Sequence, residues 1–543
     1  MQGYITANNE TALNIDNAGL FSVRKQDNGG KHVAISNFND GTINNTGSIE
    51  LMAVNGVANN DTTGEYTPTG ALSSGEEGIQ HGQLLGVKDF NHSGVLDIRG
   101  SGLSGNVFVI TGDKTTAGNN GNGNFTTSGG VLKVATTLNE GGANSRSDML
   151  VADNIIKGTD STKVAISIAQ ASTGGKTVDD GIQIIKTLGT QDKTAFTLAG
   201  PVTFGEYEYL LFGENAHGDA DGFYLRNFLK DTDTKVYLPN PNIGGYLGNQ
   251  YAAANMFNQN ILDRRDNARA PDETVWARVQ YNHMNTEQLK GTQKLKVDTS
   301  LVQVGADLYR DEQEGKVAGV FFGYGDSDVK NRSKLTGSEV KGSVKGIQLG
   351  GYYSWMPQDD NKGAFVDIWG HYAHFSNELS GAAQANSSKK YKGNGLALSI
   401  EGGYGFEVGR TEYNTWILEP HAQATYNYLK MDDFTDKNET RFKNNKSNGF
   451  TTRVGARFYG YKENQVGVLP FVELNWLHNG VDNGVYVNNT RKDSKIGRNV
   501  GELKLGAKGN ITEHSSISAH IGVQQGSDKF RNSLGQLVFN YNF

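Results

Sequence analysis

The chain ends in the stretch LVFNYNF, residues 537–543, in which hydrophobic residues occupy every second position. In an extended segment, Leu537, Phe539, Tyr541 and Phe543 share one face, and the two asparagines between them share the other. The alternation predicts a final β-strand with one apolar face, closed by an aromatic residue at the last position of the chain.

The same alternation continues upstream through the last 270 or so residues. Segments of about ten residues, the length that a tilted membrane strand requires, each place apolar side chains on one face and polar or small ones on the other. An even number of such strands predicts a closed antiparallel barrel without the unpaired edges that lipid cannot satisfy. The twelve predicted strands are 275–282, 297–309, 316–324, 344–355, 364–375, 396–407, 416–428, 451–461, 468–478, 499–511, 515–524 and 536–543.

Charged residues of both signs recur on the polar face of these strands. We expect them to line the barrel lumen and to pair with one another, a structural role that we favour over a catalytic one. The lumen-facing candidates are Arg278, Asp367, Glu401, Glu419, Arg453 and Arg457.

Composition excludes several classes of protein. No run approaches 18 apolar residues, which excludes a transmembrane helix and leaves a membrane β-barrel open. The net charge of −7 gives no reason to expect nucleic acid as a partner, and the absence of Cys excludes disulfides and thiolate sites. The first ten residues lack the pattern of a signal peptide, so the chain is either cytoplasmic or part of a longer precursor.

Aromatic residues are distributed unevenly, which predicts a domain boundary. All five Trp lie beyond residue 270, and 21 of 23 Tyr lie beyond residue 200. The N-terminal part consists instead of short β-runs separated by Asn, Asp and Gly, a pattern typical of the rungs of a parallel β-helix. An ordinary β-sandwich with Gly-rich turns is the alternative. We expect a β-helix at 1–123, a cap at 124–230, a linker and helix at 231–270 and the barrel at 271–543.

One helix is predicted, at residues 242–266. Its 25 residues would extend about 37 Å, enough to cross a hydrocarbon core of roughly 30 Å. Amide and small side chains are spread around it, which favours a narrow, hydrated, polar cavity over a hydrophobic core, with a connector helix on the surface as the alternative. The residues that we expect to mark a helix inside the pore are Tyr246, Leu247, Asn249, Ala253, Asn255 and Phe257.

Beyond these patterns, a series of motifs resembles the bacterial autotransporters of type V secretion, in the branch of the pertactin and AIDA-like adhesins. Their order in the chain follows that of the family. The motifs are DMLVAD (148–153), DGIQIIKT (180–187), AFTLAG (195–200), GEYEYLL (205–211), YLGNQYAAANMF (246–257), DRRD (263–266), and Trp276 with Arg278 at the start of the barrel.

The resemblance implies an all-β protein. A fragment of a right-handed parallel β-helix, the passenger, would be followed by an autochaperone cap, a helix threaded through the pore and a twelve-stranded translocator in the outer membrane. It implies secretion of the passenger to the cell surface, where it would act as an adhesin with an unidentified ligand. Outer-membrane lipid, periplasmic chaperones and the barrel-assembly machinery are the implied partners, and residues 537–543 resemble the signal that this machinery reads.

Catalytic and metal-binding motifs are not evident in the sequence. GYGDSD (323–328) lacks the glycine of a serine-protease signature, and the histidines lack metal-ligand spacing. We therefore predict no catalytic residues, no metal and no cofactor. An enzymatic passenger whose catalytic part lies upstream, and a channel plugged by the helix, remain the alternatives.

Overall fold

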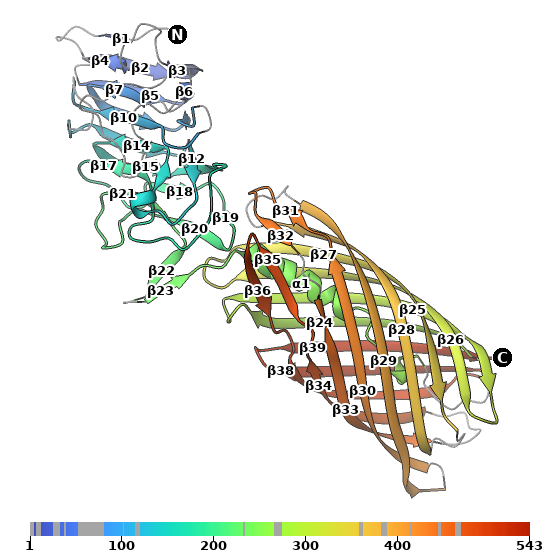
Figure 1. Cartoon of the computed structure of the whole chain (residues 1–543). Helices are drawn as coiled ribbons and strands as arrows, with labels where there is room; N and C mark the ends of the chain where they lie inside the picture. The colour runs from blue at the N-terminus through green and yellow to red at the C-terminus, as the bar shows by residue number, and fades with distance from the viewer. Residues whose placement is uncertain are drawn as a thin grey trace. The chain divides into compact units, whose positions relative to one another are not determined.

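The computed structural model describes residues 5–6, 12–24, 33–36, 40–52, 81–100, 103–114, 120–231, 234–264, 274–357, 362–381, 388–412, 415–443, 447–461 and 468–543. It divides into two compact units, Met1–Leu238 and Pro239–Phe543, which are described separately (Figure 1). Among the described residues, no helix is both long enough and apolar enough to span a membrane.

Three parallel sheets wind around the core of the first unit, which confirms the predicted parallel β-helix. The first sheet contains β1 (Ile5–Thr6), β4 (Val33–Ser36), β7 (His81–Leu85), β10 (Val107–Thr111), β14 (Met149–Ala152) and β17 (Ile182–Thr187). The second contains β2 (Asn14–Asn17), β5 (Gly41–Asn45), β8 (Val87–His92), β11 (Asn124–Ser128) and β15 (Asn154–Asp160). The third contains β3 (Leu20–Arg24), β6 (Ser48–Met52), β9 (Val95–Asp97), β12 (Val131–Thr137), β16 (Thr162–Ile168) and β18 (Phe196–Leu198).

Like side chains stack from one coil of the β-helix to the next. Phe90 pairs in register with Phe125, and their rings are stacked with centroids 5.1 Å apart. Asn17 donates to Asn45 at 2.8 Å, and Asn45 lies 3.2 Å from the ring nitrogen Nδ1 of the buried His92. Each coil therefore completes the core and the polar ladder of its neighbour, as expected of a repeat stack.

The last coil changes from parallel to antiparallel pairing. β21 (Gly222–Arg226) runs antiparallel to β17, and β20 (Tyr207–Phe212) and β19 (Val202–Phe204) extend the same sheet. Tyr209, Phe223 and Leu225 are fully buried there. This hairpin layer covers the end of the apolar core. The remaining short elements of the unit are β13 (Arg146–Ser147), the 3-10 turn η1 (Gly142–Asn144), β22 (Phe228–Asp231) and β23 (Thr234–Tyr237).

The expected linker at the start of residues 231–270 contains paired structure. β23 runs antiparallel to β22, with Leu229 opposite Val236. The polar composition of this stretch therefore belongs in part to a hairpin, whose strand β23 begins with two exposed residues, Thr234 and Lys235.

Twelve antiparallel strands close into a barrel in the second unit, which confirms the predicted number (Figure 1). β39 closes the barrel by pairing with β24 along twelve residues. The strands are β24 (Thr274–Gln288), β25 (Gln293–Asp311), β26 (Lys316–Ser333), β27 (Glu339–Trp355), β28 (Gly363–Ser380), β29 (Ser388–Arg410), β30 (Thr415–Met431), β33 (Ser447–Tyr461), β34 (Val468–Asn479), β37 (Asn499–Asn510), β38 (Ser515–Gly526) and β39 (Arg531–Asn542).

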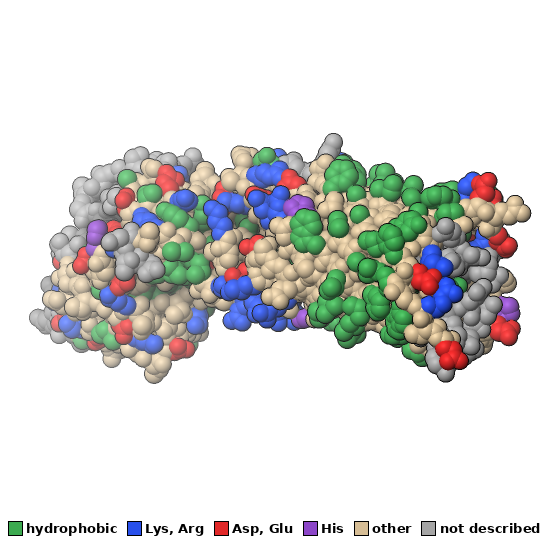
Figure 2. Space-filling model, turned by 90° about the horizontal axis from the view of Figure 1, so that it is seen from below, with side chains coloured by type: hydrophobic (Ala, Val, Ile, Leu, Met, Phe, Trp, Pro, Cys, Tyr) green, Lys and Arg blue, Asp and Glu red, His purple; other side chains and the backbone are tan. Residues whose placement is uncertain are grey.

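Two connections at one end of the barrel form a small sheet of their own. It consists of β31 (Phe434–Thr435), β32 (Arg441–Lys443), β35 (Asn483–Val487) and β36 (Thr490–Ser494). A broad band of hydrophobic side chains covers the outer surface of the barrel, as Figure 2 shows for one face. Exposed apolar residues such as Val320, Leu398 and Ile521 belong to this surface, which is the one that a membrane barrel presents to lipid.

Candidate functional site

The described residues form one α-helix, α1 (Pro241–Asn255), which lies inside one end of the barrel (Figure 1). The side chain of Asn240 caps the helix by accepting a hydrogen bond from the Asn242 amide at 3.0 Å, and Pro241 occupies the first helical position. Twelve of its 15 residues are buried. Burial on nearly all sides requires that the helix be surrounded by the barrel wall rather than laid against one surface.

Glycines allow this helix to approach the wall closely. A Cβ atom on Gly248 would lie 2.6 Å from Leu295 Cδ1 and 2.7 Å from Val329 Cγ1, and one on Gly245 would lie 2.7 Å from Val340 Cγ1. These wall residues belong to β25, β26 and β27, the strands on which α1 mainly packs. The helix and the wall therefore pack so closely that one added methyl group on either glycine would clash with the wall.

Polar side chains of the wall bind the backbone of α1 along its length. Gln288 donates to the carbonyl of Gly244 at 2.9 Å, and Asn331 donates to the carbonyl of Pro241 at 2.8 Å. Asn249 donates to the hydroxyl of Tyr391 at 2.9 Å and to the carbonyl of Glu378 at 2.9 Å. These bonds fix the height and rotation of the helix.

The predicted helix 242–266 is wrong in its length. The helix ends at Asn255, and only the short 3-10 turn η2 (Ile261–Asp263) follows within the described part of 256–264. Asn260 begins this turn with a capping box, in which its side chain accepts from the Asp263 amide and Asp263 accepts from the Asn260 amide. Asparagine side chains compete in this way for backbone groups, which explains why the helix does not continue. A helix of 15 residues rises about 22 Å, less than a hydrocarbon core of roughly 30 Å.

The prediction of a hydrated, polar surround is also wrong for α1 itself. Ile243, Tyr246 and Leu247 are fully buried in one hydrophobic cluster with wall residues such as Val340 and Phe375. Tyr246 stacks on Tyr391 with ring centroids 5.6 Å apart. The expected pore residues Ala253 and Phe257 are buried in the same cluster, whereas Asn255 lines a cavity farther along the lumen.

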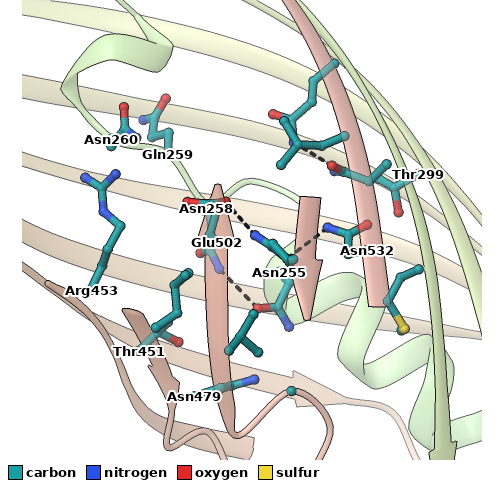
Figure 3. Close-up of a pocket in the computed structure, with 18 of the residues that line it drawn as sticks. Asn255, Asn258, Gln259, Asn260, Thr299, Thr451, Arg453, Asn479, Glu502 and Asn532 are labelled. Atoms are coloured by element: carbon teal, nitrogen blue, oxygen red, sulfur yellow. Dashed lines mark hydrogen bonds between the residues drawn. The ribbon is translucent and has the colours of Figure 1, made fainter. Parts of the chain in front are cut away.

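This cavity has a volume of about 200 Å³ and lies beside the chain that follows α1. Amides and threonines dominate its lining, and Figure 3 shows Asn255, Asn258 and Asn532 around it. Glu502 and Arg453 supply charge at its wall. A polar space of the kind that the sequence indicates thus exists, but it adjoins the segment after the helix.

The six lumen charges that we expected to line the barrel are all buried, and four of them form one network with Glu473. Arg453 is 2.6 Å from Glu401 and 3.0 Å from Glu473, and Arg457 is 3.0 Å from Glu419 and 3.2 Å from Glu473. The remaining two predicted residues form separate pairs: Asp367 binds Arg264, and Arg278 lies 3.4 Å from Asp263. Buried charges arranged in this way are paired, as burial requires.

The network holds the segment after α1 rather than the helix. Glu401 accepts a hydrogen bond from the Ile261 amide at 3.0 Å, and Gln423 donates to the Gln259 carbonyl at 2.8 Å. Gln536 donates to Asp263 at 3.1 Å. The sequence analysis missed Asp263 and Arg264 as partners of the wall. The motif DRRD at 263–266 contained the signal, although its last two residues lie outside the described part of the chain.

The last strand presents its apolar face outward. Leu537, Phe539, Tyr541 and Phe543 have exposed fractions of 51%, 43%, 42% and 71%, whereas Val538 is fully buried on the lumen side. Thr274 donates to Asn542 at 3.0 Å and joins the last strand to the first. The signal-like residues therefore lie on the lipid-facing surface, at the seam where the barrel closes.

In the first unit, the motif DMLVAD at 148–153 ties neighbouring coils together through its two carboxylates. Asp148 accepts from the amides of Asn106 at 3.0 Å and Ala135 at 2.6 Å, and Asp153 accepts from those of Gly112 and Gly123, both at 2.8 Å. Burial raises the pKa of Asp148 to about 7, against the opposing effect of these amides. The motif is structural.

Comparison with known families agrees with this architecture. The autotransporter β-domain model matches residues 275–522, and the model of autochaperone domain type 1 matches residues 107–211. The transport unit of the autotransporter AIDA-I from Escherichia coli superposes with a TM-score of 0.51 at 26% identity, covering 56% of this chain and 99% of that structure. The chain belongs to the autotransporter family.

Two relatives place this autotransporter near the AIDA-like members. The probable autotransporter YfaL of Escherichia coli K12 is 30% identical over 82% of this chain and 36% of its own length. The autotransporter adhesin AIDA-I of Escherichia coli is 28% identical over 77% of this chain and 34% of its own length. The chain thus spans about a third of the length of these relatives.

Membership of the family indicates which membrane holds the barrel and which end of the barrel faces the exterior. It lies in the outer membrane and carries the upstream unit, its passenger, on the cell surface. α1 enters the barrel at the end that bears the small sheet β31–β32–β35–β36, whereas Thr274 begins the first strand at the opposite end. The end that holds α1 therefore faces the exterior, and the end with Thr274 and Phe543 faces the periplasm.

Proposed function

We propose that this autotransporter exports and displays an adhesive, non-enzymatic β-helical passenger. The observation that carries the proposal is the order of the parts along the chain: a capped β-helix is followed by α1 and η2, and then by the strands of a closed barrel. The adhesin AIDA-I and the Brucella suis adhesin BmaC autotransporter, 27% identical over 62% of this chain, support the adhesive role.

The barrel-assembly machinery and periplasmic chaperones are part of the proposal as partners before export. Residues 537–543 would be the segment that the assembly machinery reads, and the hairpin layer β19–β20–β21 would act as the autochaperone cap from which the passenger folds. The overlap of the autochaperone match, 107–211, with the expected cap at 124–230 supports this role.

Display is tested on intact cells that express the chain from its precursor. Protease added outside should remove the first unit and leave the barrel, and cells with the displayed unit should adhere to host cells or to one another more than shaved cells do. Retention of the first unit inside intact cells would contradict display. Display without any gain in adhesion would leave export standing and contradict the adhesive role.

We further propose that α1 closes the pore after export. Its packing on β25–β28 supports a plug, as do the ion pairs that Asp263 and Arg264, in the segment after the helix, form with the barrel wall. An Ala253→Cys variant supplies the only thiol of the chain, and this thiol should resist bulky reagents in the folded barrel, whereas Glu513→Cys, an exposed position, should react. Deletion of residues 239–264 should raise the conductance in planar bilayers, and unchanged conductance would contradict the plug.

A further inference from the structure

The helix α1 packs against one side of the barrel wall. Its contacts with the wall are mainly with β25–β28, and β30 adds a smaller one. The cavity of about 200 Å³ lies beside the helix, and most of its wall residues belong to β33, β34, β37, β38, β39 and β24. Part of the lumen is therefore left beside α1, and its closure depends on other residues.

Four apolar side chains gather at the exterior end of this cavity. Leu477 on β34 stands directly opposite Val500 on β37, Met284 lies on β24, and Phe530 directly precedes β39. All four line the cavity, and Met284, Val500 and Phe530 are at most 4% exposed. We call Met284, Leu477, Val500 and Phe530 the apolar collar. The collar belongs to the same hydrophobic cluster as the buried residues of α1, so it extends the apolar contact of the helix to the opposite wall.

Two connections at the exterior end position Phe530 in the collar. In the turn between β38 and β39, the Phe530 amide donates to the Ser527 carbonyl at 2.9 Å, and the Phe530 carbonyl accepts from the Gly526 amide at 3.0 Å. Gly497, in the connection before β37, lies against the ring with a φ of +59°, and a Cβ there would lie 3.0 Å from Phe530 Cε2. Both the backbone conformation and the close approach favour glycine at this position.

The lumen on the periplasmic side of the collar is polar. Asn532 donates to Gln524 at 3.0 Å, and Gln524 donates to Glu502 at 2.7 Å; Figure 3 shows Asn532 and Glu502 at the cavity. The side-chain amide of Gln259 is buried and has no hydrogen-bond partner among the described residues. A polar cavity of this size accommodates water, which satisfies such groups. The collar therefore separates a hydrated space from the exterior.

A second cavity adjoins the first one on the periplasmic side. Its volume is about 70 Å³, and it shares the lining residues Asn260, Asp263, Lys504 and His520 with the first cavity. Its lining reaches Tyr461, the last residue of β33. The two adjoining cavities thus extend along this wall from the collar towards the periplasmic ends of the strands.

We propose that the apolar collar is a second barrier of the pore, which excludes ions and water-soluble molecules from the part of the lumen that α1 leaves open. An apolar constriction resists wetting, and an ion must lose water to pass it. This inference goes beyond the proposed closure by α1 and rests on it only in that α1 blocks the rest of the lumen. The barrier depends on the polarity of the collar and not only on its volume, and this dependence can be tested.

The test changes the polarity of the collar while keeping its shape. The collar variant combines Met284→Gln with Val500→Thr in the full chain, because the new side chains have nearly the old size but form hydrogen bonds with water. The control combines Val454→Thr with Val523→Thr, at two residues of the outer surface that are 53% and 56% exposed. Heat-modifiable migration first confirms that each barrel is folded, and the conductance is then measured in planar bilayers in potassium chloride. Thr451→Cys, added to each variant, places the only thiol of the chain at the cavity.

The collar variant should conduct about tenfold more than the parent and the control, which corresponds to a barrier lower by about 1.4 kcal/mol. A charged thiol reagent should reduce this added conductance through the cysteine at position 451, because the ions pass the cavity. Unchanged conductance of the folded collar variant, or added conductance that the reagent does not reduce, would overturn the proposal. Deletion of residues 239–264 tests α1 in the same bilayers. If only the deletion variant conducts, the collar is contradicted; if only the collar variant conducts, closure by α1 is contradicted.

Discussion

Arg453 and Glu401 form the contact through which the barrel wall reaches the chain that crosses its lumen. The guanidinium Nη2 of Arg453 lies 2.6 Å from Glu401 Oε1, and the second oxygen of Glu401 accepts the Ile261 amide at 3.0 Å. Arg453 also donates to Glu473 at 3.0 Å. One arginine thus compensates two buried carboxylates, one of which holds the segment after α1.

Replacing Arg453 by Met should strongly destabilise the barrel. The change leaves Glu401 and Glu473 short of a partner, and breaking a buried pair costs about 3–5 kcal/mol. The midpoint of heat-modifiable migration should fall accordingly. The double variant Arg453→Met/Glu401→Gln should recover part of the loss, because the unpaired charge is removed with its partner. Equal losses in the single and double variants would show that the two residues are not coupled.

The positions of the barrel strands could be predicted from the sequence, but their full lengths could not. The strands were predictable because outward apolar residues such as Val320 and Phe322 alternate with lumen residues, but the predicted strand 316–324 ends where the outward face of β26 becomes polar. β26 continues to Ser333, held by ladder hydrogen bonds that hydropathy does not report. The thickness of the membrane sets how far the alternation of apolar and polar residues extends along a strand. Hydrogen bonding to the neighbouring strands sets the length of the strand.

The lumen contacts were beyond sequence reasoning because they depend on register. Glu401, Arg453 and Glu473 could each be assigned to the polar face, yet their meeting requires that β29, β30, β33 and β34 pair as they do. The amides of residues 249–260 were noticed, but whether they continue a helix or cap a turn depends on the wall opposite them. Asn249 reaches its partners because Gly342 leaves space, since a Cβ there would lie 2.0 Å from Asn249 Oδ1.

Replacing Gly248 by Val should displace α1 from its wall. The new side chain would meet Leu295 and Val329 at distances below 3 Å, and overpacking of this kind costs about 1–3 kcal/mol. Combined with Ala253→Cys, the variant should label with thiol reagents faster than Ala253→Cys alone. Gly535→Ala is the control, because a Cβ at Gly535 meets nothing within 4 Å. Unchanged labelling with Gly248→Val would contradict the close packing of the helix.

Replacing Phe223 by Ala should weaken the passenger without affecting the barrel. Phe223 is fully buried in the hairpin layer and packs edge-on against Phe196, with ring centroids 5.0 Å apart. Truncating a buried Phe costs about 3–5 kcal/mol. Protease resistance of the displayed passenger should fall, while heat-modifiable migration of the barrel should not change. Leu103→Ala, at a residue that is 45% exposed, is the control and should leave protease resistance intact.

His92 should make the passenger sensitive to acid. Burial lowers the pKa of His92 to about 4 from an ordinary value of 6.5, so the unfolded chain takes up the proton first as the pH falls. Its contribution is fully present above pH 6.5 and is lost between pH 6.5 and 4, by up to about 3 kcal/mol. Asp148, with its pKa raised to about 7, acts in the opposite sense, because its contribution is lost as the pH rises from about 4 to 7.

The two effects are separated by comparing the parent with His92→Gln, in which Asp148 is unchanged. Glutamine can still accept the hydrogen bond from Asn45. Between pH 7.5 and 4, the stability of the variant relative to the parent should rise by about 3 kcal/mol, measured from the unfolding of the passenger in the full chain. A difference that does not depend on pH would show that His92 is not buried in its neutral form.

Replacing Phe543 by Asp should block assembly of the barrel in the outer membrane. The side chain is 71% exposed at the periplasmic end of the last strand, next to the seam where β39 joins β24, and Tyr541 packs against it edge-on at 5.1 Å. A carboxylate at this position would disrupt the apolar, lipid-facing run that closes the barrel.

Asn542→Asp is the matched control, because it adds the same charge one residue earlier, away from the lipid face, and keeps an oxygen that can accept from Thr274. Folded barrel in outer-membrane fractions should be nearly absent for Phe543→Asp and close to the parental level for Asn542→Asp. Equal levels of folded barrel in the two variants would show that the apolar end of the last strand is not what assembly requires.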